Sequence, residues 1–342
     1  MAITCVLLGA LQKQSPGITF SNSQGTAVCN RIGEAYVDDT EFWLTIPDCS
    51  ITQFAAEMQD IAQHKEQLLF TTGGALALEK CSHVALEWSF PNDKHKLKGP
   101  EDLKTSIQLT SSNNYNDHIS IVQSGPSEGQ RNLGAWIAPD SNNAADLTVL
   151  CNKGLSMSIN IAASRLKRHE VSIAYKTMLL PAIKYSLSST TLTIQECNRV
   201  NQSFLPTLLS RMGFNHCTKQ LLLFGPPSLG AYGFTNTWTY QGIAQIQILL
   251  GHLCKNEEIG VQTDILLETL QLVIGSSLPS FIFPLAQVLK FRTHSWLLNV
   301  WEFLLSIHGT IHLERAWKIG ATMHKRCLPH GFFHDAPATS PS

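Results

Sequence analysis

The sequence predicts an α+β fold, in which a small antiparallel sheet with one long helix is followed by a mainly helical region. Up to about residue 140, short apolar segments alternate with turn-forming residues, as the strands of a small sheet do. Beyond that point, apolar residues recur mainly at helical spacing. The length of 342 residues exceeds that of one typical domain, so more than one compact region is expected.

Bulk composition excludes several classes of protein. Hydrophobic residues make up 44% of the chain and charged residues only 15%, which allows buried cores. The net charge of -1 does not mark a nucleic-acid binder, so such binding needs local basic patches. Nine scattered cysteines without a CxxC pair argue against a disulfide scaffold and fit a reducing intracellular compartment. The apolar stretches 261–274 and 279–289 are shorter than the ~20 residues that span a bilayer, so no membrane partner is expected.

The first strands are expected on either side of a tight hairpin. Residues 27–36 have the pattern of a strand, and residues 41–46 have that of its antiparallel partner. Between them, Val37-Asp38-Asp39-Thr40 is expected to form the turn, because Asp is a common turn residue.

The clearest helix is predicted for residues 52–70, where apolar residues recur at helical spacing. Ser50 and Gln53 form a predicted capping box at its start, and the Gly73-Gly74 pair ends it. Residues 76–90 favour a short helix or turn followed by a strand.

Residues 91–130 are rich in Asn, Ser, Lys, Asp, Gly and Pro, and are predicted to form a polar surface insertion. Short strands are predicted within it at 106–109 and 119–122, and after it at 133–138.

From about residue 143 the chain is predicted to be helical. Segments 146–166 and 170–180 are amphipathic and meet at the basic residues 165–169, and Pro181 is expected to interrupt the second helix. A loop is predicted at 224–234 and a disordered tail at 329–342. Further helices are predicted at 193–209, 261–274 and 295–308, whereas 243–253 fits either a helix or a strand.

Two adjacent aspartates, Asp38 and Asp39, are the most specific chemical feature of the sequence. Neighbouring carboxylates repel each other, so a cation is expected to stabilise the pair. Mg²⁺ prefers oxygen ligands and keeps substrate phosphates in its shell, which suits a two-metal phosphoryl-transfer site at the hairpin. The alternative is a solvated Asp-Asp turn without a ligand.

The segment Tyr36-Val37-Asp38-Asp39 resembles the YxDD motif of reverse transcriptases, the RNA-directed DNA polymerases. Residues 73–81 follow at the distance of the next palm motif, with Lys80 at the place of its lysine but Ala77 near that of its asparagine. The resemblance extends over roughly residues 15–320 and points to the enzymes of LINE-like and protist retroelements. Weaker similarities lie in residues 131–134, 154–187, 223–226 and 229–234.

This resemblance implies part of a right-hand polymerase, which uses an RNA template, a DNA primer and deoxynucleotides. Residues 1–140 correspond to the C-terminal part of a palm with a polar insertion near 91–130. Residues 141–215 correspond to a helical thumb, and residues 216–328 to a helical C-terminal extension. Two Mg²⁺ ions, with Mn²⁺ as a substitute, are the implied cofactors.

The resemblance also implies roles for individual side chains. Asp38 is the favoured metal ligand and Asp39 the second one, while Lys80 is expected to protonate the pyrophosphate leaving group. The alternative for Lys80 is an exposed lysine at the start of a strand. The alternative for the basic thumb segment is a solvated helix end, where cations suit the helix macrodipole. Contacts to nucleic acid are expected from Tyr36, Arg165, Lys167 and Arg168.

One departure from the family bears on activity. A palm of this family needs another aspartate on an earlier strand and a Gly-rich nucleotide-selecting motif, yet the 35 residues before Tyr36 contain no Asp. We therefore expect that the chain does not polymerise by itself, and that an N-terminal polymerase half is a missing partner. The alternatives are a decayed retroelement remnant, a non-catalytic nucleic-acid or protein interaction module, and a truncated gene model.

The C-terminal residues raise the alternative of a zinc site. His308 and His312 are spaced as neighbours on one helix face, and His324, Cys327 and His330 have ligand-like spacing. Structural zinc sites usually use paired cysteines, so a His-rich tail without metal is the favoured interpretation.

Overall fold

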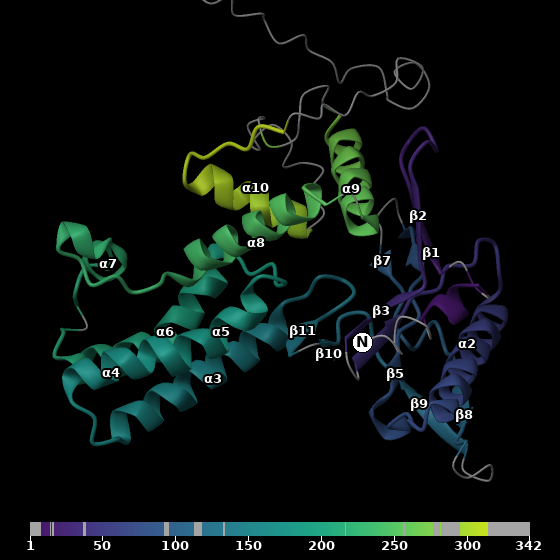
Figure 1. The fold of residues 1–342 in the computed structure, drawn as a ribbon, viewed down its shortest axis with the longest axis horizontal. Helices are drawn as coiled ribbons and strands as arrows, with labels where there is room; N and C mark the ends of the chain where they lie inside the picture. Colours follow the sequence, from purple (N-terminus) through teal and green to yellow (C-terminus); the bar gives the residue numbers. More distant parts are fainter. Residues whose placement is uncertain are drawn as a thin grey trace, which may run out of the picture. The chain divides into compact units, whose positions relative to one another are not determined.

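Helices and small sheets make up the structure, which confirms the predicted α+β class (Figure 1). Its contacts divide the chain into two compact units, one of residues 1–19 and 30–248 and the other of residues 20–29 and 249–342. None of the described helices is both long and apolar enough to cross a bilayer. This computed structural model describes residues 8–13, 15, 17–36, 39–91, 96–112, 118–132, 134–215, 217–255, 257–275, 281 and 295–313.

The strand that the sequence predicts over residues 27–36 is divided at Ile32. The Ile32 side chain is buried, and its carbonyl accepts a hydrogen bond from the Trp43 N–H at 2.7 Å. The next residue, Gly33, has to be a glycine, because a Cβ at this position would lie 2.0 Å from the Glu41 carbonyl oxygen. The two resulting hairpins are β1 (Ile18–Ser21) with β2 (Val28–Arg31), and β3 (Gly33–Tyr36) with β4 (Asp39–Phe42).

The long helix α2 (Ile51–Thr71) begins and ends close to where the sequence predicts. The Ser50 hydroxyl accepts a hydrogen bond from the Gln53 N–H at 3.3 Å, and the Gln53 side chain accepts one from the Ser50 N–H at 3.0 Å. This capping box satisfies two backbone donors that the first helical turn leaves unpaired. Gly73, just beyond the last turn, has a φ of 83°, the left-handed conformation that favours glycine.

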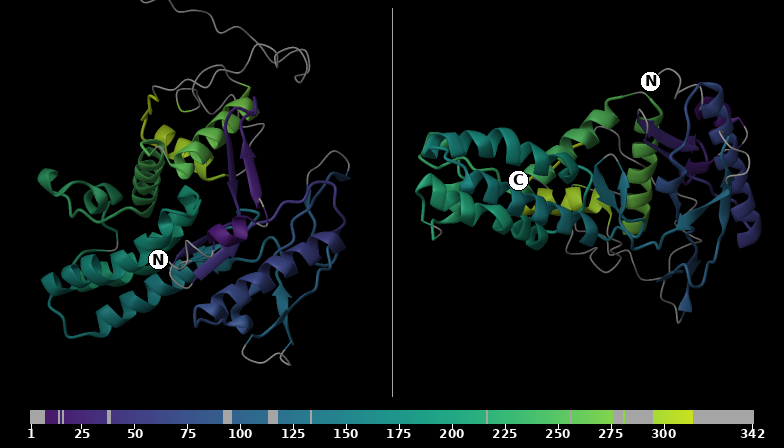
Figure 2. Two further views of the ribbon diagram at one scale, coloured as in Figure 1. Left: turned by 45° about the vertical axis from the view of Figure 1, so that its right-hand side comes forward. Right: turned by 90° about the horizontal axis from the view of Figure 1, so that it is seen from below.

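A three-stranded sheet packs against α2 in the order β5-β9-β8 (Figure 2). Its core contains the buried side chains Leu78, Ile107, Leu109 and Ile121. Part of the stretch expected as a surface insertion therefore belongs to the core, because β8 and β9 alternate apolar residues toward α2. The elements are η1 (Leu78–Lys80), β5 (Ser82–His83), β8 (Ile107–Thr110) and β9 (His118–Gln123), with the short strands β6 (Trp88–Ser89) and β7 (Lys96–Leu97) between them.

Side chains of α2 pair with the backbone along the outer edge of β8. The Gln63 Oε1 atom accepts a hydrogen bond from the Thr110 N–H at 2.8 Å, and the Gln63 Nε2 atom donates one to the Thr110 carbonyl at 3.0 Å. Glu66 is buried and accepts hydrogen bonds from the N–H of Ser112, at 3.0 Å, and from its hydroxyl. The Gln59 Oε1 atom accepts a third such hydrogen bond, from the Gln108 N–H at 3.2 Å.

The helical part of the first unit is built around α3 and α6, which lie side by side (Figure 2). The expected interruption at Pro181 is wrong. Pro181 lies within a continuous helical run, in which a π-helical segment over Tyr175–Leu179 joins α4 to α5 directly before the proline. The helices are α3 (Ala144–Ala163), α4 (Arg168–Ala174), α5 (Leu180–Leu187) and α6 (Ile194–Met212), preceded by the hairpin β10 (Gln130–Asn132) and β11 (Ala135–Ile137).

The segment predicted as a loop at 224–234 contains a short 3-10 turn, and residues 243–253 are helical. Apolar side chains such as Leu249 are buried on one face of that helix, which decides between the helix and strand alternatives. The elements are α7 (Gln220–Phe224), η4 (Pro227–Leu229) and α8 (Thr237–Leu253).

The described part of the second unit contains the helices that the sequence predicts at 261–274 and 295–308. Ser295 caps α10 by accepting a hydrogen bond from the Leu298 N–H at 3.3 Å. The turn after β1 is held to α9, because the Glu268 carboxylate accepts a hydrogen bond from the Ser23 N–H at 3.2 Å. The helices are α9 (Glu258–Ile274) and α10 (Trp296–Ser306), and the predicted tail at 329–342 lies outside the described residues.

Candidate functional site

The hairpin that carries the two aspartates has a shorter connection between its strands than the turn Val37-Asp38-Asp39-Thr40 that the sequence predicts. Tyr36 at the end of β3 is paired with Asp39 at the start of β4. Asp39 and Thr40 therefore belong to a strand and not to the turn, because the antiparallel register extends to the last residue before the connection. Val37 and Asp38, the two connecting residues, lie outside the described residues.

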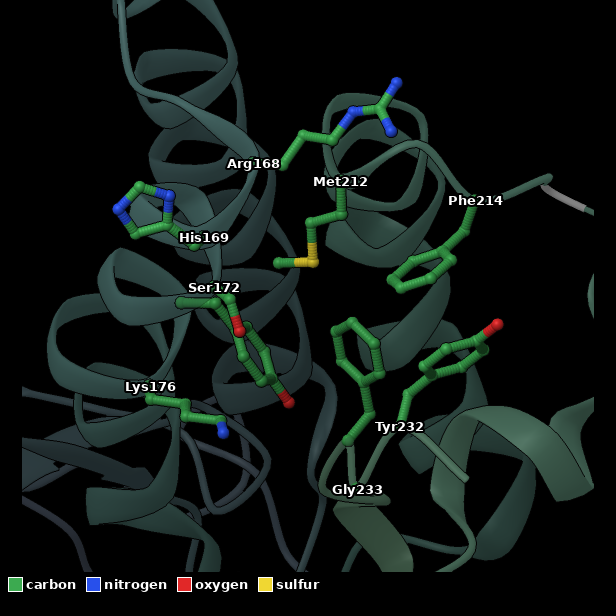
Figure 3. Close-up of a pocket in the computed structure, with 10 residues that line it drawn as sticks. Arg168, His169, Ser172, Lys176, Met212, Phe214, Tyr232 and Gly233 are labelled. Atoms are coloured by element: carbon green, nitrogen blue, oxygen red, sulfur yellow. The ribbon is translucent and has the colours of Figure 1, made fainter. Parts of the chain in front are cut away.

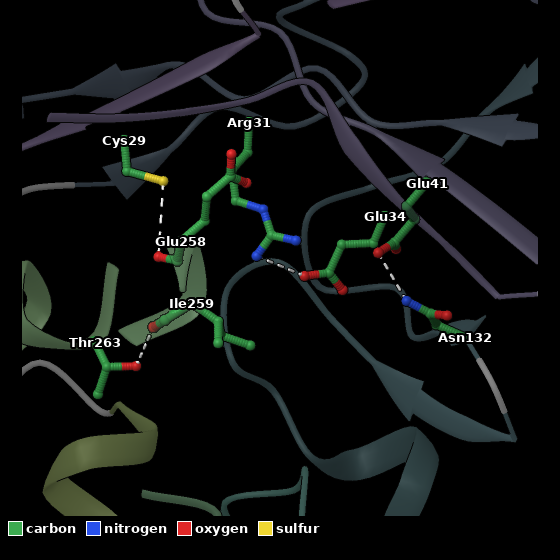
Figure 4. A network of polar contacts seen from close by, with 8 residues as sticks. All are labelled: Cys29, Arg31, Glu34, Glu41, Asn132, Glu258, Ile259 and Thr263. Carbon is green, nitrogen blue, oxygen red and sulfur yellow. Dashed lines mark hydrogen bonds and ion pairs between the residues drawn. The ribbon is translucent and has the colours of Figure 1, made fainter. Parts of the chain in front are cut away.

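Two glutamates face each other across the same hairpin, and the sequence analysis missed both. Glu34 is directly opposite Glu41 in the register, a like-charge arrangement that destabilises a strand pair. Arg31 forms an ion pair with Glu34 at 3.2 Å, and the Asn132 amide donates a hydrogen bond to Glu41 at 2.7 Å (Figure 4). Loss of solvent around the carboxyl, and then the charge of Glu34, raise the pKa of Glu41.

Carboxylate oxygens are the donor set that this hairpin offers to a metal ion. Asp38 and Asp39 are consecutive, and Glu41 follows Asp39 by two residues in the same strand. Hard oxygen ligands of this kind fit Mg²⁺ or Mn²⁺. Among the side chains that the structure describes, no group of three His, Cys, Asp or Glu residues could hold a metal ion.

Lys80 is the last residue of η1 and is exposed. Its N–H donates to the Ala77 carbonyl at 2.8 Å, so its backbone closes the 3-10 turn before β5. No described contact joins the Lys80 side chain to the hairpin, so the expected role of this lysine stays a prediction.

The three predicted basic residues lie close together in the chain, from the turn after α3 to the first residue of α4. All three side chains are exposed, and Lys167 is the N-cap of α4, where its N–H donates to Glu170 at 2.7 Å. Arg211 from α6, which the sequence analysis missed, donates hydrogen bonds to the carbonyls of Ser164 at 2.9 Å and Leu166 at 3.4 Å. Arg211 therefore satisfies carbonyls in the segment between α3 and α4, and the cations exposed in this part of the chain are other residues. These are Arg165, Lys167 and Arg168.

Arg168 also lines a pocket of about 280 Å³ in the first unit (Figure 3). Phe214 and Tyr232 face Ser172 and Lys176 across it. These residues come from α4, the segment after it, the end of α6 and the loop before α8. Sequence analysis could not find this pocket, because no local pattern connects three segments that are about 20 to 60 residues apart in the chain.

The proposed histidine pair near the C-terminus does not share a helix face. α10 ends at Ser306, and His308 has a φ of 53°, which ends the helical geometry before His312. His324, Cys327 and His330 lie outside the described residues.

Comparison of the chain with protein-family models, with curated proteins and with solved structures finds no match.

Proposed function

We propose that the chain supplies the metal-binding hairpin and the nucleic-acid-binding helices of an RNA-directed DNA polymerase, similar to the reverse transcriptases of LINE-like elements. One observation carries the proposal: the register pairs Tyr36 with Asp39, so only Val37 and Asp38 connect the two strands. A two-residue connection is the commonest tight hairpin, and it keeps two consecutive aspartates next to a strand end.

In this proposal Asp38 and Asp39 hold Mg²⁺ through their carboxylate oxygens. When bound there, Mg²⁺ would supply Lewis-acid activation of a primer hydroxyl and neutralisation of the triphosphate charge. Asp38 is the principal ligand and Asp39 the second one, while exposed Lys80 donates a proton to the pyrophosphate. The RNA template and DNA primer are held through their phosphates by Arg165, Lys167 and Arg168.

A second candidate function is a non-catalytic nucleic-acid-binding module. The observation that favours it is the exposure of all three cations within residues 165–168, from the turn after α3 to the first residue of α4. Exposed Lys and Arg side chains bind phosphates without any need for the acidic hairpin.

The proposal is tested by Mn²⁺ binding, measured by electron paramagnetic resonance with and without a primer–template duplex. We expect bound Mn²⁺ in the native chain and its loss in the variants Asp38→Asn and Asp39→Asn. Asp102→Asn, which changes an exposed aspartate in a turn outside the hairpin, is the matched control and should leave Mn²⁺ binding unchanged. Equal Mn²⁺ binding by the native chain and the double variant Asp38→Asn/Asp39→Asn would overturn the proposal.

A primer-extension assay with the same preparations separates the two candidate functions. We expect no template-dependent incorporation by the chain alone, because two carboxylates leave the metal ions short of protein ligands. Duplex binding without any Mn²⁺ binding would favour the non-catalytic module.

A further inference from the structure

Aromatic side chains form one wall of the pocket in the first unit. The ring centroids of Phe214 and Tyr232 are 4.0 Å apart with 40° between the ring planes, and those of Tyr175 and Phe234 are 5.0 Å apart. Gly233 has a φ of 66°, so the chain turns sharply between Tyr232 and Phe234 and both residues line the pocket. Tyr232 is 43% exposed, which leaves part of its ring open to a ligand.

Two cations, Arg168 and Lys176, line the same pocket, and its described lining contains no Asp or Glu. The Arg168 side chain lies against Gly213, where a Cβ would approach the guanidinium carbon to 2.8 Å, so a glycine at this helix end makes room for the cation. Glu170 lies 3.9 Å from His169, and its carboxylate already accepts a hydrogen bond from the Lys167 N–H at the start of α4.

The combination of flat apolar rings and cations defines the chemistry of the ligand. Nucleobases stack on aromatic side chains whatever their sequence, and Arg and Lys bind the adjoining phosphate. A volume of about 280 Å³ suits one base with its phosphate, and it is far too small for a base-paired duplex.

We infer that this pocket binds an unpaired nucleobase, which stacks on Tyr232 and Phe214, while the attached phosphate contacts Arg168 and Lys176. The ligand is a single-stranded nucleic acid or a free nucleotide, which share this chemistry. The inference goes beyond the proposed polymerase role, because the aromatic residues that hold the base have no part in that role and Arg168 is the residue that the two proposals share.

The test is fluorescence anisotropy of the full chain with a short labelled oligonucleotide, the same strand with abasic positions, and its duplex. Tyr232→Ala should weaken binding of the single strand by about 5- to 100-fold, whereas Tyr232→Phe keeps the ring and should not. Arg168→Gln should weaken binding and lower the slope of affinity against salt by about one, unlike Lys104→Gln at an exposed lysine outside the pocket.

Competition with a mononucleotide distinguishes the two sources of the ligand. Displacement of the strand by the mononucleotide assigns the pocket to free nucleotides, and binding without displacement assigns it to a strand. Equal affinity for the intact and abasic strands, or binding unchanged by Tyr232→Ala, would overturn the inference. The pocket proposal is tested by oligonucleotide binding and the polymerase proposal by Mn²⁺ binding, so failure of one and failure of the other are seen in different measurements.

Discussion

The phenolic oxygen of Tyr175 accepts a hydrogen bond from the backbone N–H of Thr235, with 3.2 Å between the two atoms. Tyr175 is 1% exposed, and burial raises the pKa of its hydroxyl, so the group stays protonated and neutral at physiological pH. The bond ties the π-helical segment to the loop that carries Tyr232 and Phe234. The position of Tyr232 and Phe234 in the aromatic wall therefore depends on a hydrogen bond made by Tyr175, a buried member of the same wall.

Replacing Tyr175 by Phe keeps the buried ring and removes this acceptor. We expect faster hydrogen exchange at Thr235 and its neighbours, and about 2- to 10-fold weaker binding of a single strand, because one hydrogen bond contributes about 0.5 to 1.5 kcal/mol. Exchange measured by mass spectrometry on the peptide around Thr235 checks the first effect. Tyr185→Phe, at a tyrosine that is 63% exposed, is the control and should change neither quantity.

A second prediction concerns the contact between α2 and β8. Gln63→Leu leaves the N–H and the carbonyl of Thr110 without their side-chain partner, so we expect a loss of about 1 to 3 kcal/mol in the free energy of unfolding. Urea denaturation measures it. Gln67→Leu changes an exposed glutamine of the same helix and should shift the unfolding midpoint little. Comparable losses in both variants would contradict the pairing role of Gln63.

The third prediction is a pH dependence caused by Lys65. Burial lowers the pKa of Lys65 from 10.5 to about 8, although its Nζ lies 4.7 Å from the centroid of the Phe42 ring. Between those pH values the folded chain has released this proton while the unfolded chain still binds it, so this group makes the free energy of unfolding rise with pH. Below about pH 8 both states are charged and the fold carries the cost of burying the charge.

Lys65→Met should therefore raise the free energy of unfolding near neutral pH, by on the order of 1 to 3 kcal/mol. The gain should shrink as the pH increases toward 10.5, where the native lysine is neutral in the fold. Denaturation curves recorded across this pH range measure the difference. A gain that is independent of pH, or one that the exposed-site variant Lys104→Met reproduces, would refute the assignment to Lys65.

The fourth prediction concerns the glutamate pair on the hairpin. Glu41→Gln removes the repulsion from Glu34 and retains an oxygen that can accept the Asn132 hydrogen bond. We expect a gain of about 0.2 to 1 kcal/mol at neutral pH, the usual size of a cross-strand pair interaction. Because the pKa of Glu41 is raised, the gain should disappear at acidic pH, where the native carboxyl is protonated. A thermal unfolding series over pH follows it, with the exposed Glu101→Gln as a control that should show no such trend.

Helix ends can be predicted from this sequence because they depend on neighbouring residues. Ser50 and Gln53 lie three residues apart, and their capping box needs no tertiary contact. The strands at 106–109 and 119–122 are also predictable, since alternation of apolar residues reports burial on one face. The position of these strands in the core could not be predicted, because the polar residues around them dominate the composition of the stretch 91–130.

Features that depend on distant residues could not be predicted. Pro181 reads as a helix breaker, and only the π-helical segment before it lets the helix continue. Asp39 lies in a strand because it pairs with Tyr36, and this register cannot be seen in a sequence whose residues favour a turn. The aromatic pocket and Arg211 depend on tertiary packing, so their roles are visible only when the segments are brought together.

The three α2 side chains along β8 also limit how the sheet can associate. Gln59, Gln63 and Glu66 already accept hydrogen bonds from alternate N–H groups of this edge, so a strand from another molecule finds no donors there. Strand exchange between copies through this sheet is therefore directed to its opposite side, where the described pairs of β5 with β9 are Ser82 with Val122 and His83 with Gln123. One edge of the sheet is thus protected against intermolecular growth by side chains of its own helix.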